Sequence, residues 1–223
     1  MQKLVQGIHQ FQTQIFSSHK ELFERLDRQD QTPETLFITC SDSRINPNLI
    51  TQTEPGELFI LRNVGNLVPP YEHMGGMAAG IEFAVASLHV KDIIVCGHSN
   101  CGAMKALLEP EQLGELPATK AWLAHARSTE RIIWESYGHL KDQELLHATV
   151  EENVLVQVEN LRTHPAVAKA VANGMLHLHA WFYKIETGEV FAFDPDRGQY
   201  ISVTGTEGLA PLNAGHRATD LSI

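Results

Sequence analysis

Short apolar runs alternate with helical segments through the middle of this 223-residue chain, and this alternation is the feature that most restricts its fold. The runs TLFITC (35–40) and DIIVC (92–96) have the length and composition of buried strands, and ELFILRNV (57–64) is a further candidate between them. A helical segment rich in small residues, GGMAAGIEFAVASLHV (75–90), precedes the last of these strands. Strands and helices in this order predict one α/β domain with a central, mostly parallel β-sheet flanked by helices.

The ends of the chain differ from this alternating core. Residues 1–28 keep apolar side chains at roughly helical spacing with a second apolar edge, which predicts an N-terminal helical arm over 1–30 that packs on more than its own domain. The main domain is expected over 31–205. Residues 206–223 are Gly-rich and polar and predict a peripheral C-terminal tail. Two longer helices and a closing pair of strands complete the expected elements, at 118–137, 142–163 and 174–195.

A formal net charge of −10 argues against a nucleic-acid binder and against docking on an anionic membrane surface, since both need a basic face. The N-terminus lacks the continuous apolar segment of a signal peptide, and no stretch approaches the roughly 20 apolar residues of a membrane helix. The three cysteines, an odd number, predict thiols or metal ligands rather than a disulfide framework. We therefore expect a cytoplasmic protein with neither nucleic-acid nor membrane partners.

Two short motifs place cysteine and histidine at the ends of predicted strands. CSDSR (40–44) puts Cys40 at the end of the first strand, and GHSNCG (97–102) puts His98 at the end of the third, with Cys101 opening the next helix. Functional groups gather beyond the carboxyl ends of parallel strands, so the three side chains converge if the two strands are neighbours. Two thiolates and an imidazole are good zinc ligands, and three protein ligands leave the open fourth position of a catalytic site.

The first motif also carries a carboxylate and a guanidinium. A zinc ion held by two thiolates and a neutral imidazole has no net charge, so a bound water is acidified less than on a three-histidine zinc. A hydrogen-bond acceptor that orients this water and handles its proton is then useful, and Asp42 is placed for that role. Arg44 can hold the Asp42 carboxylate in a bidentate pair, which keeps it ionised and away from the metal.

Each of these residues alone also has a purely structural interpretation, as a buried cysteine, a satisfied histidine or a loop salt bridge. The joint pattern favours the metal site, because all of them fall at predicted strand ends with complementary chemistry. His177 and His179 lie on one face of a predicted strand and could bind a metal, but the sequence shows no third ligand for them. Cys96 is interpreted as a buried strand residue.

The two motifs together resemble those of the β-class carbonic anhydrases, which carry Cys-x-Asp-x-Arg and His-x-x-Cys. The similarity extends through EPGELFILRNVGNLVPPY, GIEFAVASL, VEENVLVQVENLRTHP and LHAWFYKIETGEV, so that it covers nearly the whole chain. It is closest to the cyanobacterial and plant-like branch, and neither motif departs from the family pattern. The resemblance implies that 31–205 is a zinc-binding catalytic domain.

The resemblance implies a zinc enzyme that hydrates CO₂ reversibly to bicarbonate and a proton through a zinc-bound hydroxide. One Zn²⁺ per chain would be held by Cys40, His98 and Cys101, with Asp42 and Arg44 as the catalytic pair. The resemblance also implies a homodimer or a dimer-based higher homo-oligomer, in which the N-terminal arm clasps a second copy of the chain.

A substrate pocket follows from the same resemblance. Gln31 matches a glutamine that helps to hold the substrate, and Phe59, Val64 and Phe83 fall where the family lines its pocket with apolar side chains. A dry apolar wall suits CO₂, which is small, linear and uncharged. Gly102, directly after the last ligand, would leave room and a backbone N–H near the metal.

Two other functions fit the same resemblance. A catalytically silent family member could act as a scaffold or as a bicarbonate-binding module, although a complete ligand set and Asp–Arg pair argue against it. The same site could instead hydrolyse carbon disulfide or carbonyl sulfide, since access to the pocket decides the substrate. Carboxysomal family members carry a long C-terminal extension, and this chain ends soon after its core, which favours the cytoplasm over the carboxysome.

Overall fold

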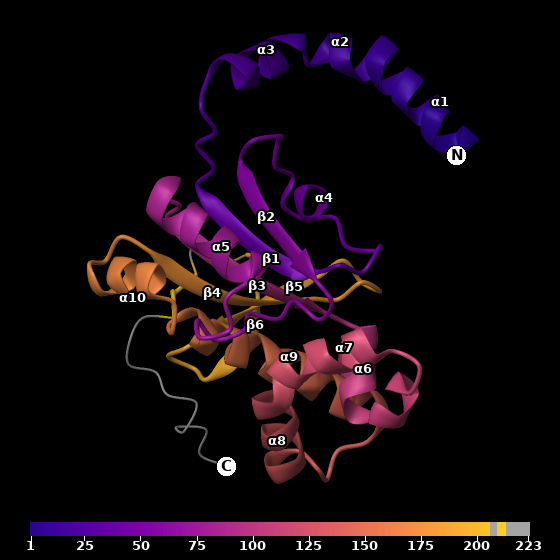
Figure 1. Ribbon diagram of the computed structural model, residues 1–223, viewed down its shortest axis with the longest axis vertical. Coiled ribbons are helices and arrows are strands. Elements are labelled where there is room, and N and C mark those ends of the chain that lie inside the picture. The colour runs from indigo at the N-terminus through magenta and orange to yellow at the C-terminus, as the bar shows by residue number, and fades with distance from the viewer. Residues whose placement is uncertain (206–208, 213–223) are drawn as a thin grey trace. The chain divides into compact units, whose positions relative to one another are not determined.

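The structure, a computed structural model, describes residues 1–205 and 209–212 of the chain. The chain divides into two compact units, Met1–Thr32 and Pro33–Ile223, and the ribbon of each can be followed in Figure 1. Most of the tail that the sequence predicts over 206–223 therefore lies outside the described residues.

Leu212 is one described residue of this predicted tail. It is 5% exposed and packs in the main hydrophobic core. Its backbone N–H donates to the Leu178 carbonyl at 2.8 Å. Leu212 thus belongs to the core, at a position that the sequence assigns to the peripheral tail.

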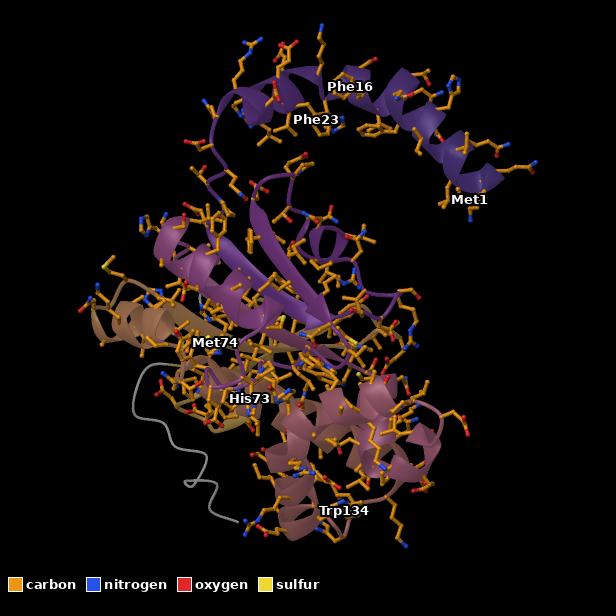
Figure 2. All side chains as sticks on the ribbon, in the orientation of Figure 1. Met1, Phe16, Phe23, His73, Met74 and Trp134 are labelled. Atoms are coloured by element: carbon orange, nitrogen blue, oxygen red, sulfur yellow. The ribbon has the colours of Figure 1, made fainter. Side chains whose placement is uncertain are left out.

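Residues 2–28 of the N-terminal unit are helical, with a break at His19. The segments are α1 (Gln2–Gln10), a π-helical turn (Phe11–Ile15), α2 (Phe16–Ser18) and α3 (Lys20–Arg28). Figure 2 shows the side chains of Phe16 and Phe23, whose rings stack with centroids 5.3 Å apart. Leu4 and Ile8 of α1 are 65% and 58% exposed, so an apolar edge of this unit stays uncovered in the described chain.

The second unit is built on a six-stranded sheet with the strand order β2-β1-β3-β4-β5-β6. The strands are β1 (Thr35–Cys40), β2 (Leu58–Asn63), β3 (Asp92–His98), β4 (His177–Tyr183), β5 (Val190–Asp194) and β6 (Gln199–Ser202). The first four strands in the sheet order are parallel, and β5 and β6 are each antiparallel to the preceding strand. This arrangement confirms the predicted α/β domain with a mostly parallel sheet. β6 was not predicted, because a four-residue strand is too short to show a clear period.

The helices of the second unit are α4 (Pro47–Thr51), α5 (Gly76–Glu82), α6 (Gly102–Leu108), α7 (Pro117–Leu123), α8 (Arg127–Ser136), α9 (Asp142–Leu161) and α10 (Pro165–Ala172). A π-helical turn extends α5, and a 3-10 turn divides the helix expected over 118–137 into α7 and α8. α10 was not predicted: Pro165 follows the end of α9 but also starts the next helix, since proline is tolerated in the first turn. No described helix has both the length and the apolar character that a membrane crossing requires.

The main core lies between one face of the sheet and helices α5, α9 and α10. Its members on the sheet are Leu36, Ile38, Ile93, Val95, Leu178 and Ala180, and those on the helices include Ile81, Val154, Val158, Leu161 and Val167. α9 lies against β3 and β4, because its valines and leucines recur every three or four residues on one side. Figure 1 shows α6, α7 and α8 gathered together, apart from α5 and α10.

The other face of the sheet carries a smaller apolar cluster. Phe37, Ile94 and Cys96 are buried there, and the Phe37 ring packs edge-on against Trp181 with centroids 6.1 Å apart. The partly buried residues around them are Leu58, Ile60, Trp181 and Tyr183. Alternate residues of a strand point to opposite faces, so this cluster is separate from the core under α9.

Gly97, the residue before His98, determines how closely α9 can approach the sheet. A Cβ atom at Gly97 would lie 2.7 Å from a methyl carbon of Val150 and 2.7 Å from one of Val154, both on α9. Carbon atoms do not approach this closely, so any larger residue at this position must displace these methyl groups or the helix that carries them.

We expect Gly97→Ala to lower the free energy of unfolding by about 1–3 kcal/mol, the usual cost of forcing an extra carbon into a packed core. Urea unfolding followed by far-UV circular dichroism measures the change. Gly76→Ala is the matched control, because a Cβ there meets nothing within 4 Å, and it should not lower stability. Equal stability of Gly97→Ala and the parent would contradict the close contact between α9 and β3.

Candidate active site

Cys40, His98 and Cys101 converge at the carboxyl ends of two neighbouring strands. β1 and β3 pair in parallel with Thr39 opposite Cys96, so Cys40 and His98 follow at the same edge of the sheet. Cys101 forms the N-cap of α6, which begins directly after it. One donor atom from each of the three residues lies within 4.8 Å of the other two, and the residues are 6%, 0% and 1% exposed.

A tight turn brings Cys101 back toward His98. Asn100 has a φ of +56°, a left-handed conformation that asparagine tolerates better than most residues. Cys101 then returns to an extended backbone with φ −65° and ψ 118°, and its carbonyl accepts the N–H of Lys105. On the other side of the group, the Gly65 N–H donates to Cys40 Sγ at 3.4 Å. Gly65 has a φ of +83°, in the region that favours glycine.

The His98 ring has one satisfied and one unsatisfied nitrogen. Nδ1 lies 2.9 Å from the Ser99 carbonyl oxygen, which can only accept, so Nδ1 carries the proton. Nε2 is then an unprotonated acceptor, and it is buried without a hydrogen-bond partner among the described residues. A buried polar atom without a partner is costly, and a metal ion beside the two thiols would satisfy it.

The two cysteine thiols are close enough to share a proton. The hydrogen bond from Cys101 lowers the pKa of Cys40, and the same bond together with burial raises the pKa of Cys101 well above its usual value. Without a metal, one thiolate and one thiol is therefore the favoured state of Cys40 and Cys101. Deprotonation of the second thiol becomes favourable only beside a cation. Two thiolates and a neutral imidazole fit Zn²⁺ in a buried site, and three donors leave a fourth tetrahedral position.

Asp42 and Arg44 form a bidentate pair beside this group. Arg44 Nε donates to Asp42 Oδ1 at 2.9 Å, and Arg44 Nη2 donates to Asp42 Oδ2 at 2.7 Å. The side-chain bonds from Arg44, and then its backbone N–H, hold the pKa of Asp42 well below its usual range. The carboxylate is therefore ionised at neutral pH. Its Oδ2 lies 3.8 Å from His98 Nε2, so it faces the position where a metal would lie.

Arg62 holds the loop that carries Asp42. Its Nε donates to the Cys40 carbonyl at 3.0 Å, and its Nη2 donates to the Asp42 carbonyl at 2.7 Å. Arg62 reaches these atoms from β2, where it pairs with Thr39 of β1. This role was not predicted, because only the pairing of the two strands places the side chain there.

Amide side chains fix the loop after β2, which runs past the site. Asn63 donates to the Leu67 carbonyl at 2.8 Å and accepts the Leu67 N–H at 2.7 Å. From α9, Asn153 donates to the Gly65 carbonyl at 3.1 Å, and Gln157 accepts a backbone N–H of the same loop at 2.8 Å. These residues were not predicted either. The signal that could have found them is a pair of amides four residues apart on the otherwise apolar side of a helix.

The predicted pocket residues fall into separate groups. Val64 is 42% exposed and directly precedes Gly65, whose N–H donates to Cys40 Sγ. Gly102 borders open space, because a Cβ there would meet nothing within 4 Å. Phe59 and Phe83 contact each other with ring centroids 6.1 Å apart, but Phe59 lies four residues before the end of β2. That is about 13 Å along the strand from its carboxyl end. Within the second unit, the structure brings Val64 and Gly102 to the metal group but not Phe59 and Phe83; Gln31 belongs to the N-terminal unit.

The other histidine and cysteine candidates have structural explanations. His179 Nε2 lies 2.9 Å from Asp92 Oδ1, and His177 Nδ1 lies 3.7 Å from the same oxygen. Asp92 begins β3 and is about 20 Å along the strand from His98 at its end. Burial raises the pKa of Cys96 to about 12, so this thiol is an unreactive part of the core.

Comparison with known proteins agrees with this arrangement. The sequence model of the carbonic anhydrase family matches residues 35–190. A carbonic anhydrase from Synechocystis sp. is 49% identical over 196 residues, which cover 87% of this chain and 71% of that protein. A carbonic anhydrase from Pseudomonas aeruginosa is 45% identical over 204 residues, which cover 91% of this chain and 92% of that protein. The chain therefore belongs to the carbonic anhydrase family.

Solved structures identify the class within the family. The β-carbonic anhydrase CcaA matches with a TM-score of 0.88 at 47% identity, covering 91% of this chain and 98% of that one. A chain from a study of two tetrameric β-carbonic anhydrases of Sordaria macrospora matches with a TM-score of 0.79 at 29% identity. The match covers 86% of this chain and 95% of that one. The protein is a member of the β class, as the two motifs indicated.

Proposed function

We propose that this protein catalyses the reversible hydration of CO₂ to bicarbonate and a proton. The observation that carries the proposal is the buried group of Cys40, His98 and Cys101, with donors within 4.8 Å of one another, beside the Asp42–Arg44 pair. A structural zinc site uses four protein ligands, whereas this group leaves one position open. Membership of the β class supports the same activity.

A single Zn²⁺ per chain would be held by the sulfur atoms of Cys40 and Cys101 and by His98 Nε2. When bound, zinc supplies a Lewis acid that lowers the pKa of a water molecule and so provides the nucleophile for CO₂. Both ligand thiols act only when reduced, and the described cysteines are all unpaired, which supports a reducing, cytoplasmic setting.

Asp42 would accept a hydrogen bond from such a water and take part in moving its proton. The carboxylate is suited to the task because it is ionised and its Oδ2 faces His98 Nε2 across 3.8 Å. Arg44 holds both carboxylate oxygens in one plane, which aims them and keeps them off the metal. Arg62 fixes the backbone on both sides of Ser41, so that the acid cannot swing with its loop.

Val64 and the open space beside Gly102 give CO₂ an approach to the metal position. Phe59 lies too far along β2 to line the site of its own chain, and Phe83 contacts Phe59 from the turn after α5. If Phe59 and Phe83 form a pocket wall, they do so at the site of a second copy of the chain. For Gln31 we keep the proposed role of holding the substrate.

We expect the zinc-loaded protein to hold about one zinc per chain and to hydrate CO₂ in a stopped-flow assay with a pH indicator. Cys101→Ser should lose most of the zinc and most of the activity, because a serine hydroxyl does not ionise to replace the thiolate. Elemental analysis after dialysis measures the metal on the samples used for the assay.

Cys96→Ala is the matched control for this loss, since Cys96 is also buried but lies in the cluster around Phe37. It should keep both zinc and activity. A fully zinc-loaded parent that hydrates CO₂ no faster than buffer would contradict the proposed function. Full zinc occupancy in Cys101→Ser would contradict only the ligand assignment.

Asp42→Asn should keep its zinc and lose about 10²–10⁴-fold in turnover, the range for a general acid or base. Arg44→Ala should show the same pattern, because the carboxylate is then no longer aimed. Asp92→Asn is the control, since Asp92 also contacts a histidine but lies at the other end of β3. Turnover of Asp42→Asn at the parent rate would exclude Asp42 from catalysis.

We also propose that the protein is a homo-oligomer built from dimers. Leu4 and Ile8 are more than half exposed, and the sheet face around Phe37 is bordered by partly buried apolar side chains. Apolar side chains left exposed in this way are typical of association sites. The Sordaria macrospora relatives are tetrameric.

Light scattering at micromolar concentration should give the mass of a dimer or a multiple of it. Ile8→Glu should shift the distribution toward smaller species, because it places a charge on the apolar edge of α1. Lys3→Glu, a charge change on the same helix, should leave the mass unchanged. A monomeric parent would refute the proposal.

A further inference from the structure

We propose that Ser99 and Glu186 are positioning residues for the metal ligand His98. The inference rests on the proposed zinc site and concerns residues outside the ligand set and the Asp42–Arg44 pair. Ser99 follows His98 directly, and Glu186 lies in the turn between β4 and β5.

The Ser99 carbonyl determines which nitrogen of His98 is available to a metal. Nδ1 donates to this carbonyl at 2.9 Å, which leaves the unpartnered Nε2 as the ligand atom. Histidine ligands need such an outer partner, because it fixes both the tautomer and the orientation of the ring. The orientation of the His98 ring therefore depends on the position of the Ser99 backbone.

Ser99 is held by three hydrogen bonds from β4 and the turn after it. Its N–H donates to the Tyr183 carbonyl at 2.9 Å, which extends the pairing of β3 with β4. Its hydroxyl accepts the Ile185 N–H at 2.9 Å and donates to Glu186 Oε2 at 2.6 Å. A hydroxyl has one proton, so donating it to Glu186 leaves a lone pair for Ile185. Ser99 is 0% exposed, and water does not compete for these bonds.

Glu186 is exposed at the turn, yet its carboxylate is bonded to this buried hydroxyl. The hydrogen bond from Ser99 lowers the pKa of Glu186, and a backbone bond and the charges of His147 and Lys184 act in the same direction. An ionised acceptor forms a shorter and stronger bond than a neutral one, which agrees with the 2.6 Å distance. A carboxylate that served only to keep the surface charged would extend into solvent.

The turn between β4 and β5 closes without the bond between Glu186 and Ser99. Lys184 N–H donates to the Glu189 carbonyl at 2.9 Å, and Gly188 N–H donates to the Lys184 carbonyl at 2.9 Å. Thr187 Oγ1 also donates to the Glu189 carboxylate at 2.7 Å. The bond between Ser99 and Glu186 is therefore not needed to close the turn. It connects the turn to the residue that follows His98.

The test compares Glu186→Ala with Glu189→Ala in the full-length, zinc-loaded protein. Both glutamates lie in the turn between β4 and β5, and the carboxylate of each accepts a hydrogen bond from a hydroxyl. The donor is Ser99 for Glu186 and Thr187 for Glu189. Glu186→Ala should weaken zinc binding about tenfold in competition with a chromophoric chelator, the lower end of the range for partners of metal ligands. Glu189→Ala should bind zinc like the parent.

Ser99→Ala should weaken zinc binding to a similar extent, and the double variant with Glu186→Ala should be no weaker than either single variant, because both remove the same bond. Replacing zinc with Co²⁺ provides a readout of ligand geometry. The visible absorption bands of cobalt should shift in Glu186→Ala and Ser99→Ala, and Glu186→Gln, which keeps an acceptor oxygen, should restore them.

Parent-like zinc affinity and cobalt bands in Glu186→Ala would overturn the inference, even if that variant unfolded at a lower temperature. Additive losses in the double variant would also overturn it, since the two residues would then act separately. If the parent binds zinc and hydrates CO₂ while Glu186→Ala matches it, only this inference fails. If the parent does neither, the proposed function fails with it.

Discussion

The parallel pairing of β1 with β3 is the contact on which the candidate site depends. It sets the end of the strand that carries Cys40 beside the end of the strand that carries His98, although the two residues are far apart in the chain. Neighbouring elements then stabilise the residues that follow these two strand ends. β2 contributes Arg62 to the loop of Asp42, and the turn after β4 contributes the bonds to Ser99. The chemistry is thus assembled by strand order, since no single segment of the sequence contains it.

The site is a polar group set in an apolar interior, and it is held mainly by bonds to the backbone. Buried N–H and C=O groups must find partners, and here the partners are side chains of Arg62, Asn63, Asn153 and Gln157. These bonds connect the loops after β1 and β2 to β2 and α9. Three buried side-chain nitrogens have no partner among the described residues, those of Asn66, His98 and Trp181, and His98 Nε2 is the one beside the two thiols. An unsatisfied atom beside two thiols indicates a place prepared for a cation.

The sequence was sufficient for the features that local patterns encode. Short apolar runs predict that strands end at Cys40 and His98, and the motifs CSDSR and GHSNCG indicate the family. That the two strands are neighbours is known only from their pairing in the sheet. The sequence was insufficient where a residue acts through a distant partner. Arg62 and Gln157 look like an ordinary strand cation and a helix amide until the strand pairing and the packing of α9 are known. Pro165 ends one helix and starts the next, so one residue carries two opposite signals.

The absence of a side chain at Gly97 couples the metal site to the hydrophobic core. Two valine methyl groups of α9 rest directly on the backbone of the residue before His98, with no side chain between them to absorb a displacement. A change in the volume of Val150 or Val154 therefore acts directly on the backbone next to His98, the proposed ligand. If the proposed site binds zinc, substitutions on the core side of α9 would then alter its metal affinity without any contact with the metal. Such substitutions would look like simple core variation in a comparison of sequences.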